Sequence, residues 1–311
     1  MDSIPGSVVD PTYRAPIPAR RLAAFHDRLV LRDPRGRTRR QSIVPTGDGV
    51  EVRGPFEIRR HVVVTRARGV HFADATGDPN PIHRDGEVVP GAYLAAQAVS
   101  TLEVLLPRLR LESLRVSFLG VSWYGRAARL SLRCTPIACP AAGDAPAAPG
   151  LRAELRAYQD EREVANGVLE GRLEPDEPHL DLPLHRVDTH WLGRVLEFYD
   201  ALGIDPQAHL QKARGPDLSY PLGFLASLPS GSMVQRFQGE GGVLNRLTLE
   251  FHRTRLGLVG PPEVSVELPQ RLRQSFTKIL TAVKEGVETA LRGTALVLPR
   301  APKDLLTRPD V

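Results

Sequence analysis

Three polar residues that can carry out acid–base chemistry lie within one short turn. Asp78, Asn80 and His83 are spaced by two and three residues, and Pro79 and Pro81 restrict the backbone between them. The imidazole pKa lies closest to neutrality, so His83 can remove and return a proton, with the Asp78 carboxyl sharing the proton handling. Asn80 suits the orientation of the turn. Each residue alone also fits a purely structural role in a turn or a helix cap.

A helix is expected directly after this turn. The pair Pro90-Gly91 precedes the apolar run 92–106, which Pro107 closes. Its apolar residues lie nearly all round the helix, which predicts a buried element. The first amides of a helix have no intrahelical partner and lie at the positive end of its dipole. The backbone N–H at Gly91 is therefore a candidate site for stabilising a developing oxyanion.

The elements around this site predict an α+β fold. A strand (56–64) and a helix (66–75) precede the turn, and four strand-like runs follow the apolar helix: 114–118, 128–136, 151–159 and 163–173. A sheet wrapped around one buried helix accounts for this order. We expect an Arg- and Pro-rich arm (1–55), a first unit with the site (56–175), a linker (176–183) and a second unit (184–311).

The second unit resembles the first in sequence. FADATGDPNPIH, beginning at Phe72, aligns with FYDALGIDPQAH, beginning at Phe198, at a constant offset of 126 residues. Gly77 corresponds to Gly203 and His83 to His209, whereas the aspartate is displaced by one residue, to position 205. A helix, a turn, an apolar helix and strands recur in the same order. We interpret the second unit as a degenerate duplicate that has lost its site.

The segment 72–85, FADATGDPNPIHRD, resembles the MaoC-like family of hotdog-fold hydratases and dehydratases, which includes (R)-specific enoyl-CoA hydratases. It carries the family's aromatic-Ala pair, Ser/Thr-Gly-Asp and Asn-Pro-Ile/Leu-His in the same order and spacing. The resemblance covers 56–173. It implies a double hotdog for the whole chain and addition or removal of water at a 2-enoyl or (R)-3-hydroxyacyl thioester. Asp78 and His83 would be catalytic, the Gly91 amide would hold the enolate oxygen, and Asn80 would support the turn.

The resemblance also sets expectations for ligands and partners. The substrate would be an acyl-CoA or an acyl carrier protein, with coenzyme A or phosphopantetheine as part of the substrate and with neither a further cofactor nor a metal. A double hotdog forms within one chain the pair that single hotdogs make by dimerising, so both a monomer and a homodimer are compatible with it. The loop 86–89 is shorter than is usual in the family, which predicts a differently shaped pocket.

Three alternatives remain open. One is a hotdog thioesterase, although such enzymes usually keep a carboxylate early in the central helix, and here Glu103 comes about three turns in. A second is a non-catalytic acyl-thioester-binding subunit. The third is a dehydratase, isomerase or cyclase of polyketide or other secondary metabolism.

Charge and composition bound the remaining partners. The net charge is +5, and nine arginines against two acids lie in 14–40. The segment is either a solvated arm or a contact for thioester phosphates or an acidic carrier through Arg35, Arg37, Arg39 and Arg40. Nucleic-acid motifs are absent from the sequence. No apolar run approaches the roughly 18 residues that cross a bilayer, and the N-terminus lacks signal-peptide features, so we expect a cytoplasmic protein without a membrane partner.

Overall fold

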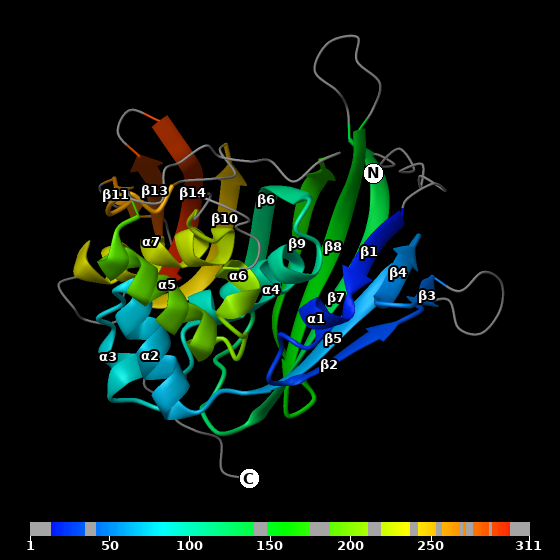
Figure 1. Cartoon of the computed structure of the whole chain (residues 1–311). Coiled ribbons are helices and arrows are strands. Elements are labelled where there is room, and N and C mark those ends of the chain that lie inside the picture. The colour runs from blue at the N-terminus through cyan, green and yellow to red at the C-terminus, as the bar shows by residue number, and fades with distance from the viewer. Residues whose placement is uncertain are drawn as a thin grey trace, which may run out of the picture.

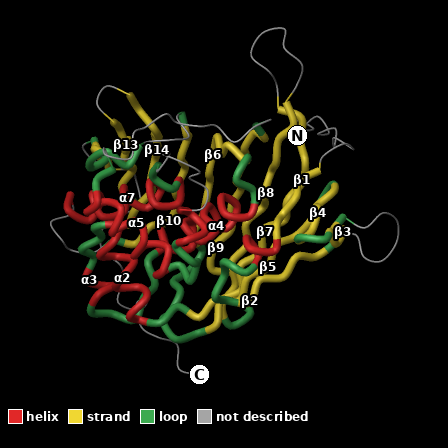
Figure 2. Tube along the Cα trace, in the orientation of Figure 1, coloured by secondary structure: helices red, strands yellow, loops and turns green. Residues whose placement is uncertain are grey.

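A computed structural model describes residues 14–34, 42–139, 148–174, 187–210, 219–236, 242–252, 257–267, 270–271, 276–285 and 288–298. Arg35, Arg37, Arg39 and Arg40 and the expected linker lie outside the described residues. Most of the described chain forms one curved antiparallel sheet with helices gathered on one face (Figure 1; Figure 2).

The sheet has eleven strands in the order β11-β13-β14-β10-β6-β9-β8-β7-β5-β2, with β12 paired to β13. Buried and exposed residues alternate along the strands, as in β7, because successive side chains point to opposite faces. The strands are β2 Arg28–Arg32, β5 Phe56–Val63, β6 Leu109–Phe118, β7 Ala127–Cys139, β8 Ala148–Gln159, β9 Arg162–Leu173, β10 Val243–Phe251, β11 Glu263–Val266, β12 Gln270–Arg271, β13 Thr277–Glu285 and β14 Glu288–Leu298.

The strand order divides the sheet into two mirrored halves. The first half runs β6-β9-β8-β7 and the second runs β10-β14-β13-β11, and β6 pairs with β10 where the halves meet. Each half follows a helix, a short helix and a central helix. In the first half these are α2 Arg66–Thr76, α3 Pro81–Arg84 and α4 Gly91–Leu105; in the second they are α5 Thr189–Ala201, α6 Gln207–Leu210 and α7 Leu222–Arg236.

Local geometry supports the internal repeat. Gly77 and Gly203 both adopt left-handed backbone conformations, with φ of 71° and 66°. This conformation favours glycine and reverses the chain after each helix. Phe72 and Phe198, the first residues of the aligned segments, contact each other with ring centroids 5.8 Å apart. The two copies of the repeat therefore pack against each other.

The central helix α4 is buried as its composition predicts. All its residues from Ala92 to Leu105 are buried, including Gln97 and Glu103. Its packing against α7 is close at Gly223, where an added Cβ would lie 2.2 Å from the Ser100 hydroxyl oxygen. The two central helices thus form the core that the two halves share.

The N-terminal region differs from expectation. The sequence of 19–31 predicts a short helix, but α1 covers only Ala19–Leu22, and 28–32 forms strand β2, which pairs with β5. RLVLR places three apolar residues between two arginines, and it pairs along β5 at the edge of the sheet. The remaining strands, β1 Arg14–Pro18, β3 Ile43–Thr46 and β4 Gly49–Arg53, form a separate small sheet.

Candidate active site

The turn after α2 is built by its own side chains. One Asp78 carboxylate oxygen, Oδ1, accepts a hydrogen bond from the Asn80 amide at 3.0 Å. Asn80 Oδ1 accepts from the Ile82 amide at 3.2 Å and begins α3, whereas Asn80 Nδ2 donates to the carbonyl of Gly242 at 3.0 Å. Asn80 therefore shapes the turn and also ties it to the second half of the chain.

His83 is oriented by the backbone of the short loop. Its Nδ1 lies 2.9 Å from the carbonyl oxygen of Val88. Because a carbonyl only accepts, Nδ1 carries the hydrogen, and in the neutral ring Nε2 is left with a free lone pair. Burial lowers the pKa of His83 below its usual value, and the charge of Asp78 acts in the opposite direction. Neutral imidazole with a free Nε2 is the form that a general base needs.

Asp78 has no exposed surface. Its second oxygen, Oδ2, accepts a hydrogen bond from the Ser230 hydroxyl at 2.9 Å. Ser230 belongs to α7, so the carboxylate is held between the two halves. Asp78 does not line the cleft described next, whereas Ser230 does. The sequence motif identifies Asp78 but gives no indication of Ser230, which comes from a Pro-Ser-Gly segment far along the chain.

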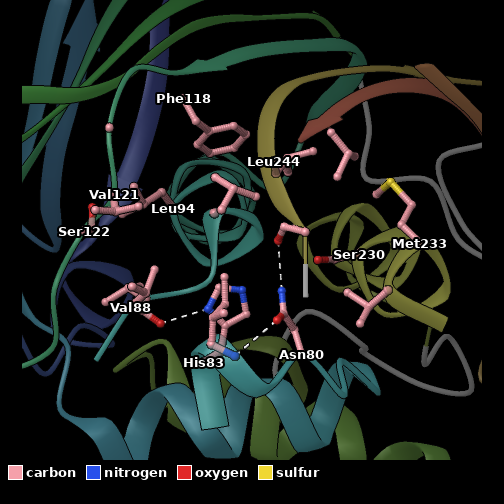
Figure 3. A pocket seen from close by; sticks show the side chains of 18 residues that line it. Asn80, His83, Val88, Leu94, Phe118, Val121, Ser122, Ser230, Met233 and Leu244 are labelled. Carbon is pink, nitrogen blue, oxygen red and sulfur yellow. Dashed lines mark hydrogen bonds between the residues drawn. The ribbon is translucent and has the colours of Figure 1, made fainter. Parts of the chain in front are cut away.

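A cleft with about 630 Å³ of empty space, its open mouth included, lies beside His83. One wall comes from the first half and includes Val88, Leu94 and Val121, and the other comes from the second half and includes Met233 and Leu244 (Figure 3). Most of the lining is apolar. The cleft therefore has a mainly apolar surface with a few polar groups at His83, Asn80 and Ser230.

The N-terminus of α4 opens into this cleft at Gly91. A Cβ at this position would lie 3.4 Å from the Phe118 ring and 3.6 Å from Leu244, both of which line the cleft. Gly91 thus keeps free the space directly beside the first amides of the helix. Of the three residues expected at the site, His83 and Gly91 line one cleft, whereas Asp78 does not line it.

The short loop 86–89 closes one wall of the cleft. Val88 forms a β-bridge with Trp123, and the Val89 amide donates to the Ser122 carbonyl at 2.8 Å. Tyr124 supports the adjacent helix by donating from its hydroxyl to the His83 carbonyl at 3.0 Å. Val88 and Val89 both line the cleft. The loop therefore forms part of the wall, and it also supplies the carbonyl that orients His83.

Searches for similar proteins found likeness in structure only. The sequence matches no family model, and no curated protein resembles it. A solved MaoC-like dehydratase superposes with a TM-score of 0.57 at 10% identity, covering 80% of this chain and 98% of the other. HtdX of Mycobacterium tuberculosis gives 0.51 at 12% identity, covering 76% and 98%. A conserved hypothetical protein of the same organism with a double hotdog fold gives 0.52 at 11%, covering 76% and 93%.

The chain is a double hotdog. The fold expected from the motif is confirmed, and the pair of central helices α4 and α7 is its core. Among the described residues, no group of three or more His, Cys, Asp and Glu side chains is placed to hold a metal ion. No described helix has the length and apolar character needed to cross a membrane.

The second hotdog half has no acidic residue at the position that matches Asp78. Ile204 stands at the position of Asp78, is fully buried, and forms a β-bridge with Phe25. Asp205, which is half-buried, repeats the local turn one residue later, with Oδ1 accepting from the Gln207 amide at 2.9 Å. The N-terminal segment that contains Phe25 thus covers the position at which the second half would have had a site.

The N-terminus of α7 is also occupied. The Glu103 carboxylate, buried near the end of α4, accepts from the amides of Leu222 at 2.9 Å and of Gly223 at 3.1 Å. These amides correspond in position to those beside Gly91. The carboxylate therefore occupies the N-terminus of α7, whereas the N-terminus of α4 opens into the cleft. Sequence reasoning considered Glu103 only as a thioesterase residue and missed this role.

Proposed function

We propose that this protein is a hydro-lyase that adds water to a 2-enoyl thioester or removes it from an (R)-3-hydroxyacyl thioester. The single observation that carries this proposal is the His83 ring. Its Nδ1 donates to Val88, which leaves Nε2 free beside a mainly apolar cleft that also contains the N-terminus of α4. The double hotdog fold, shared with the MaoC-like dehydratase, supports it.

In the dehydration direction, the thioester carbonyl would lie at the first amides of α4. These donors stabilise the negative charge that develops on the carbonyl oxygen when the proton at C2 is removed. His83 Nε2 takes that proton, and the hydroxyl at C3 leaves as water after it receives a proton from the protonated Asp78 carboxyl. The apolar lining holds the acyl chain, and the Gly91 position admits the thioester because it has no side chain. Coenzyme A or phosphopantetheine would extend through the mouth of the cleft.

The hydrogen bonds of Glu103 argue against thioester hydrolysis. This residue is the single acid on α4, and both of its carboxylate oxygens are bonded to amides of α7. It is therefore committed to the helix cap and does not line the cleft. Asp78 and His83 remain the acid–base pair, and the proposal needs no further cofactor.

Hydration of crotonyl-CoA, followed at the absorbance of the conjugated thioester, tests this proposal. We expect turnover to (R)-3-hydroxybutyryl-CoA by the unmodified protein and a loss of about 100-fold or more in His83→Ala and Asp78→Asn. Release of free thiol, measured in the same reaction, would instead show a thioesterase. Absence of both reactions with crotonyl-CoA and with a crotonyl carrier protein would contradict catalysis on enoyl thioesters.

A further inference from the structure

We propose that Ser230, on the central helix of the second half, is the residue through which Asp78 acts on the substrate. Its hydroxyl would contact the attacking water, or the leaving hydroxyl at C3, and would link it to the buried carboxylate. This inference rests on the proposed hydro-lyase function and adds a catalytic contact that the motif around Asp78 does not contain.

Burial separates the roles of the two residues. Asp78 has no exposed surface, and its two oxygens accept hydrogen bonds from the Asn80 amide and from Ser230. Ser230 is less buried and lines the cleft on the side opposite Val88 and Val121 (Figure 3). A hydroxyl that donates to a carboxylate still has lone pairs with which to accept a second hydrogen bond. Ser230 is thus the member of the pair that a substrate can reach.

The packing of α7 fixes Ser230 in this position. Its neighbour Gly231 lies so close to the site turn that a Cβ there would fall 2.2 Å from the Gly77 carbonyl oxygen. Pro229, inside the same helix, has no N–H to complete the helical ladder. Ser227, one turn earlier, bonds to its own helix by donating to Gly223 at 2.8 Å. Ser230 instead donates across the boundary between the two halves.

The protons balance if Asp78 and His83 share one proton. In hydration, the oxygen of water forms a bond to C3 and the C2–C3 double-bond electrons move toward the thioester carbonyl. The proton lost by water passes to Ser230 Oγ while the Ser230 proton passes to the Asp78 carboxylate. Protonated His83 then delivers its proton to C2 and the carbonyl re-forms. Asp78 ends protonated and His83 neutral, and a proton transfer through solvent restores the starting state.

Kinetics of three serine variants with crotonyl-CoA test this assignment. We expect Ser230→Ala to lower kcat about 100-fold with KM changed by less than about threefold, since the lost contact acts on the reacting atoms. Ser230→Thr, which keeps the hydroxyl, should recover most of the loss. Ser227→Ala is the matched control on the same helix and should retain kcat within about twofold.

The double variant Asp78→Asn/Ser230→Ala separates a relay from a purely structural effect. If Ser230 acts through Asp78, the double variant should be no slower than the slower single variant, because both changes break the same chain. Losses that multiply, or Ser230→Ala with the activity of Ser227→Ala, would overturn the assignment while leaving the hydro-lyase intact. An inactive unmodified protein would overturn the proposed function and this inference with it.

Discussion

The N-terminal amides of the two central helices, α4 and α7, have different surroundings. At α4, Gly91 leaves the first amides open to a cleft, and at α7 the corresponding amides are bonded to the Glu103 carboxylate. A helix N-terminus attracts negative charge in either case. In one half it opens into the cleft, where we propose that it binds the thioester, and in the other it is bonded to a carboxylate of the first half.

The turns that precede these two helices also differ between the halves. Asp78 is polar, buried and bonded on both oxygens, whereas Ile204 is buried beneath Phe25. The second half nevertheless contributes to the first site, through Ser230 and through the Gly242 carbonyl that accepts from Asn80. The second half therefore forms one wall of the cleft and supports the turn that contains Asp78 and Asn80.

The largest expected difference between the halves is in catalysis. His83→Ala should lower kcat/KM for crotonyl-CoA hydration by about 10²- to 10⁴-fold, the range for loss of a general acid–base group. His209→Ala, at the matching position in the repeat, should change it by less than about twofold. Equal losses in the two variants, measured in steady-state assays with folding checked by circular dichroism, would show that both halves catalyse.

A buried charge network contacts the turn that follows α5. Breaking this network is expected to give the largest loss in the free energy of unfolding. Arg60 is fully buried, with Nη2 donating to Asp27 at 3.0 Å and to the Leu202 carbonyl at 3.2 Å. Asp27→Ala leaves the guanidinium without its counter-charge and should lower the free energy of unfolding by about 3–5 kcal/mol. Glu170→Gln removes a more exposed pair with Arg152 and should cost less than about 1 kcal/mol. Similar denaturant midpoints for the two variants would contradict this.

Removing the Glu103 cap on α7 should lower the stability of the protein without abolishing its hydration activity. Glu103→Gln leaves an amide of Leu222 or Gly223 facing an NH₂ group, and we expect a loss of about 1–3 kcal/mol in urea unfolding. The hydration rate should stay within about threefold of the unmodified protein. A loss of activity comparable to that of His83→Ala, with unchanged stability, would place Glu103 in the catalytic site instead.

Two glycine variants distinguish an open helix start from a packed one. Gly223→Ala forces a Cβ against the Ser100 hydroxyl and should cost about 1–2 kcal/mol of stability, since overpacking outweighs the gain in helix propensity. Gly91→Ala meets Phe118 and Leu244 at ordinary contact distances, so it should fold normally but lower hydration about tenfold by displacing the thioester. The reverse pattern in thermal melts and rates would contradict these roles.

The smallest effect is on the pH profile. Burial lowers the pKa of His83 and the Asp78 charge raises it, so the acid limb of dehydration should fall below pH 6.5. Asp78→Asn removes the raising interaction, and its residual activity should therefore show an acid limb at still lower pH. The lowered pKa also means that the unfolded chain binds this proton more readily, so stability should fall as the pH drops below 6.5. An acid limb that moves upward in Asp78→Asn would contradict this arrangement.

Local patterns were sufficient to predict the central features of the first half. The motif at 72–85 predicted the hotdog fold, and the apolar composition of 92–106 predicted the buried helix α4. The repeat was visible from Phe198, Gly203 and the order of elements. These features depend on short-range spacing, which a sequence displays directly.

Contacts between distant segments could not be predicted in this way. Ser230 meets Asp78, and Glu103 meets α7, only because the two central helices pack side by side. The strand β2 was mistaken for helix because its pairing with β5 outweighs the local preference of the preceding alanines and arginines. These errors concern tertiary partners, which the spacing of residues along one segment does not encode.

Binding stoichiometry tests the central claim, that one half holds the thioester and the other is sealed. Calorimetric titration with butyryl-CoA, a saturated analogue that cannot be hydrated, should give one site per chain, weakened by Gly91→Ala and retained in Glu103→Gln. Two sites per chain, or one site that is lost in Glu103→Gln and unaffected by Gly91→Ala, would contradict the account. So would the absence of binding by both butyryl-CoA and butyryl phosphopantetheine.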